Sequence, residues 1–153
     1  MRLLKVSAAA VLALALMCAC SGGGAKNIDA SKAAAEIVEK VEFEDELALV
    51  DPSIVNAVYG FDSENVYASA SYMGSGATAE EVTVVTFKSL TDADKAKFDK
   101  RIESQKESYK SYNPDEMPKL SSPVIEFSGS TAILCVCNDS AAAKKVIDGI
   151  IGK

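Results

Sequence analysis

The chain has 153 residues, and its 22 acidic side chains outnumber its 16 basic ones, for a formal net charge of −6. This balance argues against nucleic acid as a partner, because binding nucleic acid depends on clustered Lys and Arg. The chain has no histidine, which excludes His-dependent triads and the commonest zinc ligand, and it has no tryptophan. These absences favour a non-catalytic protein without metal or cofactor.

The amino-terminal segment has the order of residues that is typical of a secretory signal. Arg2 and Lys5 give a basic start, an apolar run follows over residues 6–19, and Cys20 comes next, followed by small residues. This order resembles the signal of a bacterial lipoprotein. The resemblance implies removal of residues 1–19, a lipid on the thiol of Cys20, and a mature protein on the outer face of the cell membrane.

Cys18 and Cys20 compete as the lipidated residue. Signal cleavage favours a small residue just before the cut, and Ala19 precedes Cys20 whereas Met17 precedes Cys18. Cys20 is therefore the predicted site. The alternative is an uncleaved membrane helix, but the apolar run is shorter than the roughly 20 residues that a spanning helix needs.

The remaining chain divides into a tether and one domain. Residues 20–28 are rich in Ser, Gly and other small residues, which indicates a flexible tether, and residues 29–153 are predicted to form a single α+β domain. Roughly seven flexible residues reach about 15 Å on average. We therefore expect the domain to lie close to the membrane. Two acyl chains on the anchoring cysteine, which the lipoprotein resemblance implies, hold a protein stably there.

Two helices are predicted at the start of the domain. Asp29 or Ser31 caps the first, which runs to about Val41 with an apolar stripe. The second begins after Asp51, with proline at its first position, and stops at Gly60. The acidic stretch between them does not match the spacing of a calcium-binding loop, so we expect a solvated edge there.

A strand hairpin and a long helix follow. Residues 65–73 alternate with a period of two and residues 81–88 are rich in β-branched side chains, so both are predicted strands. The Gly-containing residues 74–80 connect them as a hairpin loop. Thr91 and Asp94 have the spacing of a capping box and open a long helix.

The last third of the chain predicts a second hairpin and a closing helix. The Asn-Pro-Asp-Glu-Met-Pro stretch at 113–118 ends the long helix, and strands are predicted at 123–128 and 131–138. Asp139 or Ser140 caps the final helix. The predicted fold is therefore two amino-terminal helices followed by β-β-α-β-β-α, with an antiparallel four-stranded sheet packed with helices.

Cys135 and Cys137 lie two residues apart in the last predicted strand. They point to the same face about 6.5–7 Å apart, which is too far for a disulfide without distorting the strand. A metal site has no further Cys or His to complete it. We expect both to be small core residues.

Two segments resemble a known family. GSGATAEEV at 74–82 and YNPDEMPKL at 112–120 are similar to segments of a bacterial lipoprotein family known as domain of unknown function 4358. The similarity extends from about Val41 to Asn138. The family has no assigned activity, ligand or catalytic residue, so the resemblance implies only fold and location.

One candidate surface joins the 74–80 loop to the turn at 109–118. Glycines in the loop let backbone N–H groups approach an anionic ligand, although the loop lacks the Lys-Ser/Thr ending of a P-loop, and glycines that supply positive φ at a turn are the simpler interpretation. The candidate binding residues are Gly74, Gly76, Thr78, Tyr109 and Tyr112.

The function that these features favour is a membrane-anchored, extracytoplasmic binding or protein-interaction module without catalytic activity. Its partner is expected to be an envelope protein or a small ligand near the membrane. Two alternatives stay open at this point. One is an envelope hydrolase that uses paired carboxylates, and the other is a purely structural component of the envelope.

Overall fold

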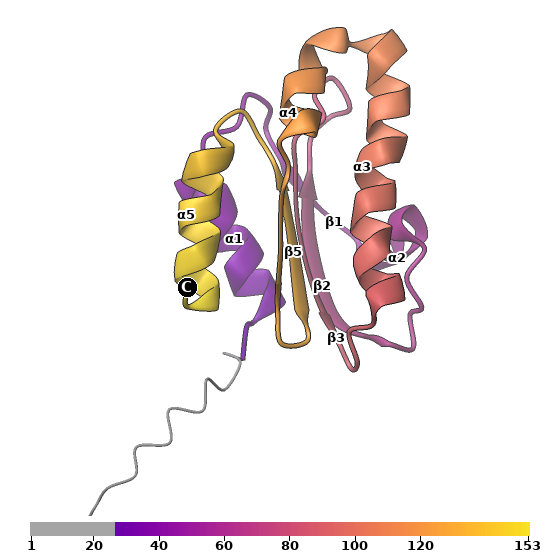
Figure 1. The fold of residues 1–153 in the computed structure, drawn as a ribbon, viewed down its shortest axis with the longest axis vertical. Coiled ribbons are helices and arrows are strands. Elements are labelled where there is room, and N and C mark those ends of the chain that lie inside the picture. Colours follow the sequence, from indigo (N-terminus) through magenta and orange to yellow (C-terminus); the bar gives the residue numbers. More distant parts are fainter. Residues whose placement is uncertain (1–26) are drawn as a thin grey trace, which may run out of the picture.

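A five-stranded antiparallel sheet lies at the centre of the computed structural model, which describes residues 27–153, and helices cover both of its faces (Figure 1). Helices α1 (Ala30–Lys40) and α5 (Ser140–Ile151) pack on one face. Helices α2 (Pro52–Tyr59) and α3 (Asp92–Tyr112) pack on the other. The predicted signal and Cys20 lie outside the described residues.

The strands are arranged in the order β1-β2-β3-β5-β4, with every neighbouring pair antiparallel. Strand β5 lies between β3 and β4 and is buried along its whole length, because helices cover both faces of the sheet. The bounds are Ala48–Val50 for β1, Val66–Met73 for β2, Glu81–Phe87 for β3, Val124–Ser128 for β4 and Thr131–Val136 for β5.

The predicted pattern of two helices followed by β-β-α-β-β-α in a four-stranded sheet is wrong. Strand β1 lies between α1 and α2 and adds a fifth strand beside β2. A 3₁₀ turn, η1 (Pro114–Glu116), and a short helix, α4 (Met117–Ser121), follow α3 where a simple turn was expected. Strand β1 has only three residues, so its identity depends on pairing with β2 and leaves no clear period in the sequence.

The observed ends of the helices agree with the caps predicted from the sequence. The side chains of Asp29, Asp51 and Asp139 each accept a hydrogen bond from a backbone N–H in the first turn of α1, α2 and α5, respectively. Thr91 forms the predicted capping box of α3. Gly60 ends α2 with a φ of 69°, a left-handed conformation that glycine adopts readily.

Each face of the sheet has its own apolar core. The core under α1 and α5 contains Cys135 and Cys137, which are buried as predicted, together with Ile28, the last residue of the predicted tether. The hydrogen bond with Cys137 and burial raise the pKa of the Cys135 thiol. The core under α2 and α3 contains an aromatic cluster in which the rings of Tyr59 and Phe61 stack 4.9 Å apart.

The start of the described chain and the loop at 74–80 lie at opposite ends of the molecule (Figure 1). The described chain begins at one end, near the first turn of α1 and the end of α5, and the loop at 74–80 lies at the other end, beside α4 and the carboxyl end of α3 (Figure 1). The strand register agrees, because Met73 pairs with Glu81 next to the loop, whereas Val66 pairs with Phe87 at the far end of the same hairpin. Within residues 27–153, no helix has the length and apolar character needed to cross a membrane.

Candidate interaction surface

The structure brings the loop at 74–80 and the turn at 109–118 together, and we call them the loop–turn surface. The hydroxyl of Tyr109 lies 3.1 Å from the carbonyl oxygen of Gly76 and also donates to the carbonyl oxygen of Thr78. Asn113 Nδ2 donates to the carbonyl oxygen of Ala77 at 3.1 Å. Side chains from the end of α3 therefore hold the backbone of the loop.

Asp45 holds the loop from the other side. Its Oδ2 atom accepts hydrogen bonds from the backbone N–H and the hydroxyl of Ser75, both at 2.8 Å, and from the hydroxyl of Thr78 at 3.3 Å. The bonds from Ser75 lower the pKa of Asp45. A Cβ atom at Gly74 would lie 2.8 Å from the same Oδ2, so the close approach of Asp45 requires glycine there.

A buried charge cluster lies beneath the loop–turn surface. Lys119 is 4% exposed, and its Nζ atom lies 3.3 Å from Glu80 Oε1, 3.1 Å from Glu116 Oε2 and 2.8 Å from Glu44 Oε2. Glu80 and Glu116 are also buried, whereas Glu44 reaches the surface. Burial opposes the charge on Lys119, but hydrogen bonds with Glu44 and Glu116 outweigh it and raise the pKa of Lys119.

The two buried carboxylates also bind backbone. Glu80 Oε2 accepts from the N–H groups of Glu44 and Asp45 at 2.8 and 2.9 Å, and Glu116 Oε2 accepts from the N–H of Ala79 at 2.8 Å. Both converge on Lys119, but at 2% and 4% exposure neither is open to a substrate. The acid–base pair of a hydrolase needs space between its carboxyl groups for the scissile bond, whereas these two carboxylates enclose the Lys119 ammonium.

Among the candidate binding residues, Tyr112 has a side chain that is exposed to solvent. It is 71% exposed, and its ring packs edge-on against that of Tyr109 at a centroid distance of 6.0 Å. On the Asp45 side of the loop, a hollow of about 430 Å³ is lined by residues 45–48 and 73–75. The loop–turn surface therefore combines a rigid loop, an exposed aromatic ring and a hollow.

A second buried network, which was not predicted from the sequence, lies between β3 and α3. Glu81 Oε1 accepts from the hydroxyls of Tyr59 and Thr83 at 2.5 and 2.8 Å. Glu81 Oε2 accepts from Arg101 Nη2 at 2.7 Å and from Gln105 Nε2 at 3.3 Å. Burial and the charge of Glu81 raise the pKa of Tyr59. One sequence signal was available, since Arg101 is the only arginine among residues 27–153 and stands in a lysine-rich helix.

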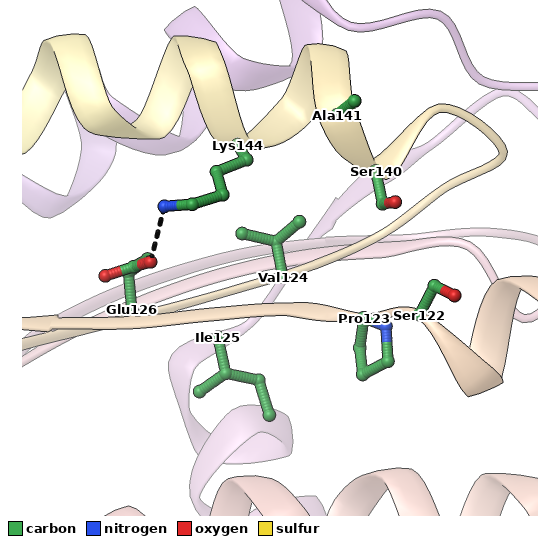
Figure 2. A pocket seen from close by; sticks show the side chains of 8 residues that line it. All are labelled: Ser122, Pro123, Val124, Ile125, Glu126, Ser140, Ala141 and Lys144. Atoms are coloured by element: carbon green, nitrogen blue, oxygen red, sulfur yellow. Dashed lines mark hydrogen bonds and ion pairs between the residues drawn. The ribbon is translucent and has the colours of Figure 1, made fainter.

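Another hollow, of about 320 Å³, lies between the start of β4 and the first turn of α5 (Figure 2). Val124 points into it, whereas Ile125 points to the opposite face of the sheet. Lys144 reaches across it to Glu126 at 2.9 Å. Hydrogen bonds from Lys153 and Lys144 lower the pKa of Glu126. In the described part of the chain, no group of three or more His, Cys, Asp or Glu side chains is placed so that it could hold a metal ion.

The comparison with protein families identifies the domain. The family described as Domain of unknown function (DUF4358) matches residues 29–137. The chain belongs to this family. The DUF4358 match runs from the cap of α1 to the end of β5, so it includes the loop–turn surface and both buried charge networks. No curated protein and no solved structure gives a match.

Proposed function

We propose that this DUF4358 protein is a bacterial lipoprotein that is anchored through Cys20 to the outer face of the cell membrane. We further propose that it is a non-catalytic binding or protein-interaction module whose partner contacts the loop–turn surface. The basic start, apolar run and small residues around Cys20 support the anchor.

The observation that carries this proposal is the separation of the two ends of the domain. The start of the described chain, before α1, and the loop–turn surface lie at opposite ends (Figure 1). A tether of roughly seven residues reaches only about 15 Å, so the end with Asn27 stays close to the bilayer. The loop–turn surface then faces away from the membrane, where an envelope partner or a ligand can reach it.

The rigidity of the loop favours binding. Hydrogen bonds from Tyr109 and Asn113 on one side, and to Asp45 on the other, order the loop before any partner arrives. A preordered surface loses less conformational entropy when it binds. An exposed tyrosine such as Tyr112 offers a large contact area and a polar tip, and this combination is common in binding hot spots.

Site-specific photocrosslinking in intact cells tests the proposal. A photoreactive phenylalanine analogue replaces Tyr112 in the full chain, and a matched variant carries it at Tyr67, which is 76% exposed at the opposite end. We expect a discrete protein adduct from position 112 that is missing from position 67, identified by mass spectrometry. Failure of position 112 to give an adduct, or the same adducts from both positions, would contradict the proposed surface.

Two substitutions test separately the contact made by the Tyr112 ring and the conformation of the loop at 74–80. Tyr112→Ala removes the exposed ring, and Gly76→Ala strains a loop residue that has a φ of 94°. We expect both variants to lose partners in pull-downs of the lipidated protein, with thermal stability unchanged for Tyr112→Ala. Unchanged partners for both variants would show that the site is elsewhere.

The anchor has its own test. Intact-mass analysis of protein extracted from membranes is expected to show a chain that begins at Cys20 and carries fatty chains. Cys20→Ser is expected to move the protein out of the membrane fraction. A retained leader or an unmodified first residue would overturn the anchor.

A further inference from the structure

Tyr67 occupies an irregular position in the sheet. Val66 pairs with Phe87 and Ala68 pairs with Thr86, so Tyr67 is an extra residue of β2 that has no partner on β3. Such a β-bulge turns the inserted side chain away from its regular direction. The result is a tyrosine that is 76% exposed, more than any other large hydrophobic residue among those described.

The bulge places the Tyr67 ring beside the first residues of the domain. Tyr67, Ala68 and Thr86 line one side of a hollow of about 290 Å³, and residues 27–31 line the other. The first of these, Asn27, follows Cys20 by a short stretch rich in glycine. A lipid on Cys20 would therefore hold Tyr67 within a few tens of ångströms of the bilayer, since roughly seven flexible residues reach about 15 Å.

Charge also distinguishes this end from the loop–turn surface. The opposite end carries a concentration of acid, with Asp115 and the carboxylates of residues 42–46. Near Tyr67 the charges are mixed, because Lys32 lies beside Asp29, and Lys88 donates its backbone N–H to the carbonyl oxygen of Asn65, which follows Glu64 in the chain. An anionic lipid surface repels the acidic end more strongly and so favours an orientation with Tyr67 toward the bilayer.

We infer that Tyr67 rests in the headgroup region of the phospholipid bilayer beside the lipid anchor, and that this contact orients the domain with the loop–turn surface outward. A tyrosine ring is apolar with a polar tip, which suits the boundary between acyl chains and water. The inference rests on the proposed anchor at Cys20 and adds a second contact with the membrane.

The absence of tryptophan from the chain makes a direct test available. Tyr67→Trp and Tyr112→Trp each introduce one fluorophore at an exposed position, at opposite ends of the domain. Each full-length variant is produced in bacterial cells, extracted from membranes and reconstituted into vesicles of phosphatidylethanolamine and phosphatidylglycerol. Parallel vesicles include a phospholipid with a spin label close to the headgroup, which quenches only fluorophores in its vicinity.

We expect the emission of the Tyr67→Trp variant to move to shorter wavelength in vesicles and to lose most of its intensity when the spin label is present. The Tyr112→Trp variant is expected to change in neither respect. Equal quenching of the two variants, or no quenching and no shift at position 67, would overturn the inference. Intact mass is measured on the same samples, so a lipidated protein with an unquenched fluorophore contradicts only the inference, whereas a protein without lipid contradicts the proposed function as well.

Iodination of the natural chain gives a second readout that needs no substitution. Lactoperoxidase, an enzyme confined to water, catalyses iodination of tyrosines that water can reach, and peptide mass spectrometry locates the product. We expect Tyr67 to be protected in vesicles relative to detergent, while Tyr112 reacts equally in both. Equal reaction of Tyr67 in vesicles and detergent would contradict contact with the bilayer.

Discussion

Glu80 and Glu81 are adjacent in the sequence, yet each is buried with a different cation. Glu80 meets Lys119 beneath the loop–turn surface, and Glu81 meets Arg101 under α3. Successive side chains of a strand point to opposite faces, which separates the two carboxylates at the start of β3. Each pair also satisfies the remaining carboxylate oxygens with further hydrogen bonds, the condition under which buried ion pairs are tolerated.

Arg101→Ala is expected to destabilise the protein by about 3–5 kcal/mol, because it leaves the Glu81 carboxylate buried without its cation. Urea unfolding followed by circular dichroism measures the change. Lys100→Ala is the matched control, since Lys100 is the exposed neighbour on the same helix, and its effect is expected to stay within about 0.5 kcal/mol. Equal effects of the two substitutions would show that the Glu81 pair is not an important contact.

At the scale of single elements, helix boundaries follow from residues close by in the chain. In the capping box of α3, the Thr91 hydroxyl accepts from the N–H of Asp94, and the Asp94 carboxylate accepts from the N–H of Thr91. Both contacts join residues three positions apart, so they form as soon as the first turn forms. Burial works against the charge of Asp94, but hydrogen bonds from Thr91 and Lys97 lower its pKa.

Thr91→Ala removes the side-chain cap of α3 and is expected to cost about 1 kcal/mol of the free energy of unfolding. Thr91→Ser keeps a hydroxyl in the same place and is expected to retain most of the stability. Thermal melting of the three proteins checks the order. A Thr91→Ser variant as unstable as Thr91→Ala would indicate that the methyl group, and not the hydroxyl, matters.

Gly149 lies inside α5, and a Cβ atom built there meets nothing within 4 Å. Gly149→Ala is therefore expected to stabilise the protein by about 0.5–1 kcal/mol, because alanine loses less conformational entropy than glycine in a helix. Gly76→Ala is the opposing control, since the φ of 94° at Gly76 disfavours any side chain. Lower stability of Gly149→Ala in urea would contradict this expectation.

At the scale of the whole molecule, charged contacts tie together segments that are far apart in the chain. Lys119 joins the segment before β1, the hairpin loop and η1, and Lys144 and Lys153 join α5 to β4 through Glu126. These contacts connect elements at the two ends of the domain, next to its apolar cores. The stability of the whole fold should therefore depend on the ionisation of carboxylates at several places.

Stability is expected to fall in acid. Hydrogen bonds from Lys119 and Asn138 lower the pKa of Glu44, those from Ser75 lower that of Asp45, and those from Lys153 and Lys144 lower that of Glu126. A carboxyl whose pKa is lower in the folded state contributes stability above its ordinary pKa, here 3.8 for Asp and 4.5 for Glu, and loses it as the pH falls further. The raised pKa of Lys119 has the opposite sign, so its contribution is lost only above its ordinary value of 10.5.

Urea unfolding at pH 7 and at steps down to about pH 3 measures this loss. The Glu126→Gln variant serves as the control, because it removes one of the titrating groups and is expected to flatten the acid limb of the curve. A free energy of unfolding that is constant through the region of the ordinary carboxyl pKa values would show that these contacts do not stabilise the folded state.

Much of the secondary structure was determined by the sequence itself. The caps at Asp29, Asp51 and Thr91, the stop at Gly60 and the two hairpins were predicted near their observed positions, because each depends on residues within a few positions of one another. The loop at 74–80 and the turn at 109–118 were also selected from local composition, and the structure brings them together.

Only the tertiary structure decided which distant residues meet. Strand β1 exists because β2 offers it an edge, and Tyr67 is turned outward because of how β2 is paired with β3. The partners of Glu80 and Glu81 could not be predicted for the same reason, since Lys119 and Arg101 stand on helices far along the chain from the start of β3. Patterns in short stretches of sequence do not indicate such contacts, because the residues that make them come from distant parts of the chain.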